Sequence, residues 1–394
     1  GSACWRNAAC APTAPNSSTS PRSTRATSRA ILTEVLDWLR THAADRPESD
    51  QRALARAAGV ASGLFAAEFP EKYGGWSLPE LVVADLREEA AASGLPYSRH
   101  ILSCPDGPSR IVLCGTPEQR ERWLRPMIEG RMRRCLAMTE ESGGSDVSAM
   151  STTATRAPGG WVLNGRKFMI SNAETADAAV VLANVVGEPV AGPTFFIFTT
   201  DVPGWRIVRR LPGMEPGYDP YEVELDGIEV GEEAVLGGPG QIGGANGMAI
   251  EWLPYGRVSL AARAIGLARW ALGVARAHAS QRRIAGGRLS DKQYIREFIV
   301  RSDVKIEASR ALIRQAARAL DEGGIAVREA AIAKLHATES ACEVIDDAMQ
   351  TLGGRGWLQE YGLERAYREA RVFRMVDGAS ELLKETIFHI PGGE

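Results

Sequence analysis

We expect an α+β fold in three parts: an N-terminal helical domain, a small middle β-barrel or β-sheet domain and a C-terminal four-helix bundle. Three observations predict it. The chain has 394 residues, 44% hydrophobic and 24% charged, a composition typical of a globular chain of two or three domains. Apolar residues recur with helical spacing near both ends of the chain. Between them lie short β-rich runs separated by turn residues.

The N-terminal part begins with a segment that has no hydrophobic period. Residues 1–28 are rich in Ser, Thr, Ala, Pro and Arg, so we interpret them as a low-complexity tail. The helical domain is expected over 29–137, where an apolar run with helical spacing begins at Ile31. Thr116 and Gln119 form a capping box with proline between them, which predicts the start of a helix.

The β domain is expected over 138–240. Apolar runs flank Asn164-Gly165, a dipeptide that tolerates positive φ and therefore predicts a hairpin turn. Asp226-Gly227 predicts a second turn. The predicted strands include residues 161–163, 168–170, 180–182, 195–198, 205–208 and 221–225.

The bundle is expected over 241–394. Its helices are predicted at about 249–283, 291–321 and 325–352, with a shorter pair after residue 362. Short loops and an apolar stripe on each helix favour antiparallel packing, because each stripe must be buried.

Composition excludes several classes of function. Lys and Arg number 46 against 49 Asp and Glu, a net charge of −3, which argues against a nucleic-acid-binding protein. No run of about 18 apolar residues occurs, so we expect no membrane segment and a cytoplasmic protein. The six cysteines form no C-x-x-C pair and the five histidines lack metal-ligand spacing, so we expect reduced thiols and no metal site.

Four segments carry candidate chemistry. The Gly- and Ser-rich loop 137–146 suits a phosphate-bearing or heteroaromatic ligand, although an ordinary turn is equally consistent. The run 164–172 ends in Ser-Asn, which is either a site or a strand terminus. Three glycines within 350–356 exceed what a helix C-cap needs, which suggests a ligand or a second subunit nearby. In the segment 368–381, Asp377 is either a reactive acid or the N-cap of the next helix.

Together these segments resemble the acyl-CoA dehydrogenase family of flavoproteins, in the family's order and at its spacing, over about residues 30–390. The motifs are Thr139-Glu140 through Gly144-Ser145-Asp146, Asn164-Gly165-x-Lys167, Gln350-x-Leu352-Gly353-Gly354-x-Gly356, Arg368-x-Ala370-Arg371 and Asp377-Gly378. The resemblance implies an acyl-CoA dehydrogenase-like fold, FAD as cofactor and a homodimer or homotetramer.

The resemblance also implies the site residues. Thr139 and Ser171 match positions whose hydroxyls bond the flavin ring, and Ser145 matches one at the pyrophosphate and the acyl-thioester. Arg282 and the segment 350–354 match residues that reach the cofactor across a dimer interface. The positions expected at the cofactor are Thr139, Ser145, Met169, Ser171, Arg282, Gln350, Gly353, Gly354 and Ser380, and those expected at the substrate are Ser145 and Arg257.

The implied reaction is α,β-dehydrogenation of an acyl-thioester. A carboxylate removes the weakly acidic α-proton while flavin N5 accepts a hydride from Cβ, and Asp377 stands at the position of the family's catalytic glutamate. Gly256 stands where a second subgroup carries its base, and Arg263 where the family usually has glycine. We interpret Arg263 as a solvated helix position or as a contact to a polar substrate. These departures favour a short or polar acyl group.

The tether and the electron acceptor remain open. The acyl group is expected on coenzyme A or on an acyl-carrier protein, and electrons are expected to pass to an electron-transfer flavoprotein or another acceptor. An alternative is a flavin-dependent oxidase or monooxygenase resembling nitroalkane oxidase, which also uses an aspartate base. A third is a non-catalytic binding or assembly protein, although the retained flavin-site residues argue against it.

Overall fold

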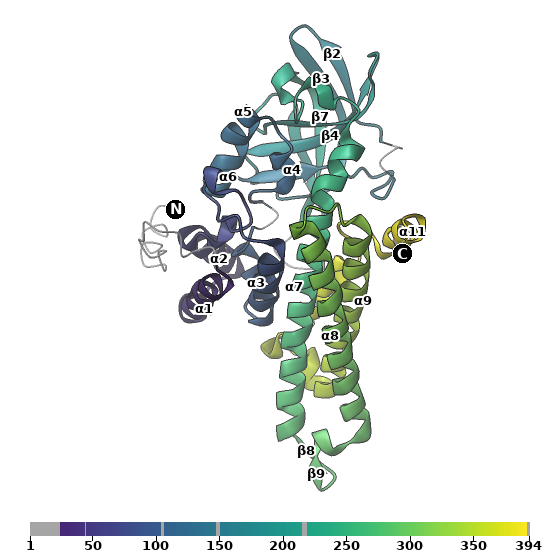
Figure 1. The fold of residues 1–394 in the computed structure, drawn as a ribbon. Helices are drawn as coiled ribbons and strands as arrows, with labels where there is room; N and C mark the ends of the chain where they lie inside the picture. Colours follow the sequence, from purple (N-terminus) through teal and green to yellow (C-terminus); the bar gives the residue numbers. More distant parts are fainter. Residues whose placement is uncertain (1–23, 44, 104–105, 147–149, 215–218, 392–394) are drawn as a thin grey trace. The chain divides into compact units, whose positions relative to one another are not determined.

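The computed structural model describes residues 24–391 apart from 44, 104–105, 147–149 and 215–218 (Figure 1). Residues 1–23 of the expected tail lie outside this part. The chain forms two compact units. Unit 1 comprises Gly1–Ser62, Leu78–Ile101 and Leu253–Glu394, and unit 2 comprises Gly63–Ser77 and Leu102–Trp252. The expected helical domain 29–137 is therefore divided between the two units, whereas the boundary at 240/241 stays a prediction.

Unit 1 is helical. It contains α1 (Arg25–His42), α2 (Glu48–Ser62), α3 (Glu80–Ala92), most of α7 (Ala245–Gln281), α8 (Gln293–Asp321), α9 (Val327–Leu352), α10 (Leu363–Phe373), α11 (Ser380–His389) and a hairpin of β8 (Arg283–Ile284) and β9 (Gly287–Arg288). The bundle predicted for the C-terminal part is confirmed. α1 begins at Arg25, four residues before the start expected for the helical domain, and the Thr24 hydroxyl accepts the Thr27 N–H at 3.3 Å.

Alanine dominates the buried core of the bundle where α7 and α9 contribute to it. By length and composition α7 is apolar enough to cross a membrane, but 67% of its most apolar window is buried inside the protein. It is therefore best explained as a core helix. Asp321 at the end of α8 accepts the first N–H groups of α3, from Glu80 at 2.6 Å and Leu81 at 3.1 Å, which ties α3 to the bundle.

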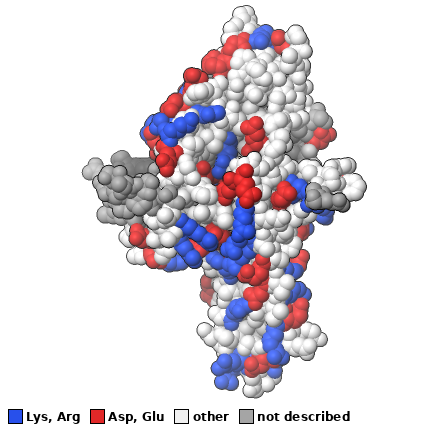
Figure 2. Space-filling model, in the orientation of Figure 1, with Lys and Arg blue, Asp and Glu red and all other residues white. Residues whose placement is uncertain are grey.

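Charges of both signs are interspersed along the bundle on the face shown in Figure 2. Ion pairs join charged side chains of the bundle, such as Arg301 with Asp347 at 2.6 Å and with Glu297 at 3.1 Å. This mixture agrees with the near-neutral net charge of the sequence.

Unit 2 is built around one seven-stranded sheet. Its elements are α4 (Arg110–Leu113), α5 (Pro117–Gln119), α6 (Arg125–Ile128), β1 (Arg134–Ala137), β2 (Thr153–Ala157), β3 (Gly160–Ser171), β4 (Ala178–Val186), β5 (Gly192–Thr199), β6 (Trp205–Arg210) and β7 (Pro220–Gly231). The strand order is β1-β4-β2-β3-β7-β6, with β5 on the other edge of β4. β1 was missed, since its four residues fell inside the expected helical domain, yet it pairs in parallel with β4.

The capping box is confirmed. Gln119 N–H donates to the Thr116 hydroxyl at 3.3 Å, and Thr116 N–H donates to the Gln119 side chain at 2.9 Å. The Gln119 amide also donates to the carbonyls of Glu233 and Val235, both at 2.8 Å, so one side chain starts the helix and fixes the segment after β7.

Both predicted hairpin turns are wrong. Asn164-Gly165 lies inside β3 and Asp226-Gly227 inside β7, at facing irregularities of the same antiparallel pair. Glycine is required at 165 because a Cβ there would lie 2.4 Å from the Thr152 hydroxyl. The Asn164 side chain accepts the Gly227 N–H at 2.8 Å. The two dipeptides therefore build a bulge, which kinks the sheet, rather than a turn.

Candidate functional site

The turn between α10 and α11 carries Asp377 in an unusual backbone conformation. Asp377 has φ +53° and Gly378 has φ +97°, so two successive residues lie in the left-handed region. Aspartate is among the few non-glycine residues that adopt this region readily. The N-cap of α11 is Ala379, so the interpretation of Asp377 as a helix cap is wrong.

Two buried cationic side chains contact this turn from different helices. Arg257 of α7 is 5% exposed, and its Nε donates to the Asp377 carbonyl at 3.2 Å. Lys334 of α9 is fully buried, and its Nζ donates to the Gly378 carbonyl at 2.7 Å. Burial lowers the pKa of Lys334 to about 8, although the negative charge of Asp377 acts in the opposite direction. Arg257, expected at the substrate, thus holds the backbone of the predicted base.

A third set of contacts stabilises the C-terminal side of the turn. The Ser380 hydroxyl donates to Glu339 at 2.6 Å, and Glu339 also pairs with Arg374 at 2.7 Å. Ser380, expected at the cofactor, is thus bonded to a carboxylate of its own unit. The sequence interpretation missed Lys334 and Glu339. The available signal was a lysine among the alanines of the buried face of α9, where a charge needs a specific partner.

The two alternative base positions lie side by side. A Cβ added to Gly256 on α7 would lie 3.5 Å from Oδ2 of Asp377. The position that carries the base in the second subgroup therefore faces the Asp377 carboxylate, and glycine leaves the space in front of it open. Glu251, the acid upstream on the same helix, instead contacts the thiol of Cys114 at 3.8 Å.

Arg263 lies two helical turns beyond Gly256 and is not the solvated residue that one interpretation expected. Its side chain is only 18% exposed, lies 3.8 Å from Glu369 and stacks 5.1 Å from the centre of the Phe373 ring. Burial and several arginines around it, Arg263 among them, lower the pKa of His100 well below its usual value. A strongly basic region is therefore built into the interior of unit 1.

The remaining unit 1 residues expected at the cofactor lie at the other end of the bundle. Arg282 follows the last residue of α7, about 37 Å along the helix axis from Arg257 at the usual rise per residue. Arg282 and Arg355 both lower the pKa of His278, although burial is the larger cause, so the segment after Gln350 lies near the same end. The structure groups Arg282 with Gln350–Gly354 and separates this group from Asp377.

The glycines after α9 have different explanations. Gly353 adopts φ +60°, which favours glycine, and a Cβ on Gly356 would lie 2.4 Å from the Met349 carbonyl. Only Gly354 has neither a positive φ nor a close neighbour in its own chain. The inference of a ligand or second subunit from surplus glycines therefore rests on Gly354 alone.

In unit 2 a buried ion pair organises the Gly- and Ser-rich loop. Nζ of the fully buried Lys167 lies 2.9 Å from Glu140, which also accepts from the Ser151 and Thr152 hydroxyls, both at 2.6 Å. Burial tends to raise the pKa of Glu140, but these hydrogen bonds outweigh it and lower the pKa to about 2. Burial lowers the pKa of Lys167 to about 8.

This ion pair joins the two segments that carry the unit 2 residues expected at the flavin. Thr139 precedes Glu140, and its carbonyl accepts the Phe168 N–H at 2.8 Å, which places the loop beside the end of β3. That strand ends at Ser171. Met169 (φ +60°) is half exposed, and the buried Nδ2 of Asn172 has no hydrogen-bond partner among the described residues. Hydroxyls and an unsatisfied amide at one strand end fit the polar edge of a flavin ring. Ser145 is exposed in the loop.

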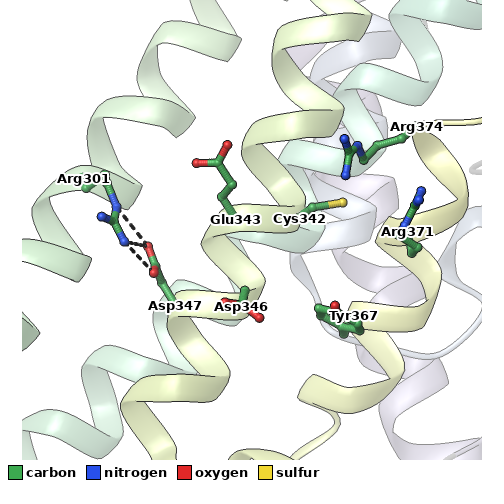
Figure 3. Close-up of a pocket in the computed structure, with 8 residues that line it drawn as sticks. All are labelled: Arg301, Cys342, Glu343, Asp346, Asp347, Tyr367, Arg371 and Arg374. Carbon is green, nitrogen blue, oxygen red and sulfur yellow. Dashed lines mark hydrogen bonds and ion pairs between the residues drawn. The ribbon is translucent and has the colours of Figure 1, made fainter. Parts of the chain in front are cut away.

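A hollow of about 400 Å³ on the bundle does not contain the predicted site (Figure 3). It lies among α8, α9 and α10, and most of its lining side chains are charged. Arg301 reaches Asp347 across it, and Arg374 is paired with Glu339. A mostly charged lining does not suit an acyl chain.

Cysteine chemistry is not indicated in the described part of the chain. Cys114, Cys135 and Cys342 are free there, and burial raises the pKa of each thiol. Cys4, Cys10 and Cys104 lie outside the described residues. No group of three metal-ligating side chains occurs among the residues that the structure describes.

Comparison with known proteins gives a consistent family match. Models of the N-terminal, middle and C-terminal domains of acyl-CoA dehydrogenase match residues 20–131, 135–227 and 246–389. The chain is similar to 3-(aryl)acrylate reductase of Clostridium sporogenes, with 32% identity over 83% of this chain and 86% of that protein. It is 33% identical to (R)-benzylsuccinyl-CoA dehydrogenase of Thauera aromatica over 86% of this chain and 84% of that protein.

A further relative and one solved structure extend this match. A subunit of the caffeyl-CoA reductase-Etf complex of Acetobacterium woodii is 32% identical over 91% of this chain and 93% of that protein. Among solved structures, butyryl-CoA dehydrogenase from Megasphaera elsdenii matches with a TM-score of 0.81 and 26% identity, covering 95% of this chain and 99% of that one.

Proposed function

The chain belongs to the acyl-CoA dehydrogenase family, and on that premise we propose that it oxidises the Cα–Cβ bond of a short or polar acyl-CoA with Asp377 as the base. Members of this family are FAD-dependent oxidoreductases that act on CH–CH groups. The observation that carries the proposal is the Asp377 carboxylate, presented on a left-handed turn opposite Gly256.

Different residues of the chain have different roles in the proposed reaction. Asp377 takes the α-proton of the thioester, and its backbone N–H donates to the thioester carbonyl, where negative charge develops. Arg257 keeps the turn in place through the Asp377 carbonyl. Thr139, Ser171 and Met169 would hold the flavin ring, and Ser145 would bind the pyrophosphate and the thioester. FAD, when bound, supplies the acceptor for the hydride that leaves Cβ.

Two observations support the expected acyl group and tether. Arg263, two turns along α7 from Gly256, and Glu369 of α10, 3.8 Å from it, are mostly buried charged side chains that favour a polar or short chain over a long aliphatic one. The relatives named for aryl and benzylsuccinyl substrates make an aryl group the other class to test. Coenzyme A is the tether in the names of two relatives, which supports it over a carrier protein.

The proposed partners are a second copy of the chain and an electron-transfer flavoprotein. Arg282 and Gln350–Gly354 lie too far along the bundle to serve the same site as Asp377, which supports a homodimer or homotetramer in which they complete the cofactor site of another subunit. A relative that forms part of an Etf complex supports an electron-transfer flavoprotein as acceptor. The cytoplasmic location stays a prediction.

The test is anaerobic bleaching of the flavin absorbance by a panel of thioesters. Butyryl-, glutaryl- and 3-phenylpropionyl-CoA cover the short, polar and aryl classes, and the same acyl groups on a carrier protein test the tether. We expect bleaching by at least one CoA thioester, with the α,β-unsaturated product seen by mass spectrometry. Absence of bleaching by every thioester, with peroxide released from nitroethane in air, would overturn the proposal in favour of the oxidase alternative.

A further inference from the structure

Two successive carbonyl groups in the Asp377 turn receive hydrogen bonds from two cations. The Asp377 carbonyl accepts from Arg257 of α7, and the Gly378 carbonyl accepts from Lys334 of α9. Aspartate tolerates the left-handed region better than most residues, but outside glycine this conformation still has a cost that the surroundings must offset. Contacts from outside the turn therefore help to hold Asp377, and these two bonds lie on the two left-handed residues.

We propose that Lys334 is a positioning residue that fixes the direction of the Asp377 carboxylate by holding the Gly378 carbonyl in the left-handed turn. The inference rests on the proposed function, in which Asp377 is the base. Lys334 does not touch the thioester in this scheme and acts through the backbone of the turn.

The chemistry of Lys334 supports a positioning role over simple packing. Its ammonium is fully buried and donates to the neutral Gly378 carbonyl. An ordinary packing residue on this alanine-rich face would be apolar, because a buried charge carries a large desolvation cost. An aspartate base is also one methylene shorter than a glutamate, so it reaches the substrate only if its backbone is held at a defined place.

The charge of Lys334 acts on the same carboxylate. The charged groups that face it are Asp377 of the turn, Arg257 of α7, Glu339 of its own helix and Glu381 of α11. A nearby ammonium favours the ionised form of the Asp377 carboxyl, which is the form that accepts a proton. Removal of the ammonium is therefore expected to disturb both the placement and the titration of the base.

Two variants separate these effects. Lys334→Met removes the donor and the charge at similar volume, whereas Lys334→Gln keeps a donor and removes the charge. Lys305→Met on α8 is the matched control, because Lys305 pairs with Glu343 away from the turn. The measurement is the rate of flavin reduction in single turnovers of the FAD-loaded protein with butyryl-CoA, or with glutaryl-CoA if butyryl-CoA does not bleach wild type, between pH 6 and 9.

We expect Lys334→Met to lower the limiting rate about 10- to 100-fold with little change in thioester affinity, as a misplaced base would. At high pH the flavin-reduction rate should fall less in Lys334→Gln than in Lys334→Met. The acid limb of the pH–rate profile of Lys334→Gln should shift to higher pH by roughly one unit relative to wild type. Lys305→Met should match wild type. A rate and acid limb unchanged in Lys334→Met would overturn the positioning role, as would a loss confined to thioester affinity.

Failure of the underlying function is recognised separately. If no thioester of the panel bleaches wild type, or if Asp377→Asn bleaches as fast as wild type, the proposed base is wrong and the role of Lys334 falls with it. If Lys334→Met does not fold, the decision passes to Lys334→Gln, whose unchanged acid limb and rate would then overturn the inference.

Discussion

The two units each bury one lysine completely, but they satisfy it differently. Lys167 in unit 2 lies 2.9 Å from the carboxylate of Glu140, whereas Lys334 in unit 1 donates to the neutral carbonyl of Gly378 at 2.7 Å. Burial lowers the pKa of both ammonium groups to about 8. The carboxylate of Glu140 thus contacts Lys167 directly, whereas Lys334 donates to a carbonyl and the carboxylate of Asp377 acts on it electrostatically.

The difference indicates two kinds of task. The Lys167–Glu140 pair closes on itself together with Ser151 and Thr152, so its main effect is to hold the loop beside Thr139 in shape. The ammonium of Lys334 acts electrostatically on Asp377, the proposed base. We therefore expect loss of Lys167 to affect mainly stability, and loss of Lys334 to affect mainly catalysis.

The largest expected stability effect follows Lys167→Met. The substitution leaves the Glu140 carboxylate buried without its cation, which typically costs about 3–5 kcal/mol. Urea unfolding of the purified protein measures it, with the exposed Lys384→Met as control. The double variant Lys167→Met/Glu140→Gln should regain part of the loss, and a double variant no more stable than Lys167→Met would contradict the ion-pair account.

Acid should destabilise unit 2 through the same carboxylate. The pKa of Glu140 is about 2 in the folded chain, against about 4.5 unfolded, so its contribution is present above pH 4.5 and is lost as pH falls toward 2. The contribution is on the order of 3 kcal/mol at most. Unfolding free energy measured from pH 5 to 3 should fall less steeply in Glu140→Gln than in wild type. Equal slopes of unfolding free energy against pH in wild type and Glu140→Gln would contradict this explanation.

Lys334→Met should cost less stability than Lys167→Met. It leaves a buried carbonyl unsatisfied but no unpaired carboxylate in contact, and such a loss costs about 1–3 kcal/mol. The same urea experiment gives the comparison. If Lys334→Met proves the more destabilising of the two, the division of tasks between these lysines is wrong.

The smallest effect is expected at Gly256. Alanine there places a methyl group 3.5 Å from Oδ2 of Asp377, so the flavin-reduction rate should fall by less than about tenfold. Helix stability should rise by about 0.5–1 kcal/mol. Gly273→Ala is the matched control, since Gly273 lies in the same helix with nothing within 4 Å of its added Cβ. Gly273→Ala should gain the same helix stability and leave the flavin-reduction rate unchanged.

The sequence predicted the arrangement of domains well because amphipathic helices have a period that single residues do not disturb. α8 and α9 lie within a few residues of the predicted helices. Turn chemistry was less informative: Asn164-Gly165 and Asp226-Gly227 serve a bulge, since positive φ is required in both settings. Asp377 was identified by resemblance. Lys334 and Glu339 were missed because their role depends on a turn some 40 residues away in sequence.

The central claim is that Asp377 is the base of a thioester dehydrogenase, and α-proton exchange tests it most directly. The acyl-CoA that bleaches wild type fastest is incubated in D₂O with protein whose flavin is kept reduced, so that no net oxidation occurs, and deuterium at Cα is measured by mass spectrometry. We predict exchange with wild type and at least about 1000-fold slower exchange with Asp377→Asn that still binds FAD. Exchange by Asp377→Asn at the wild-type rate would contradict the account.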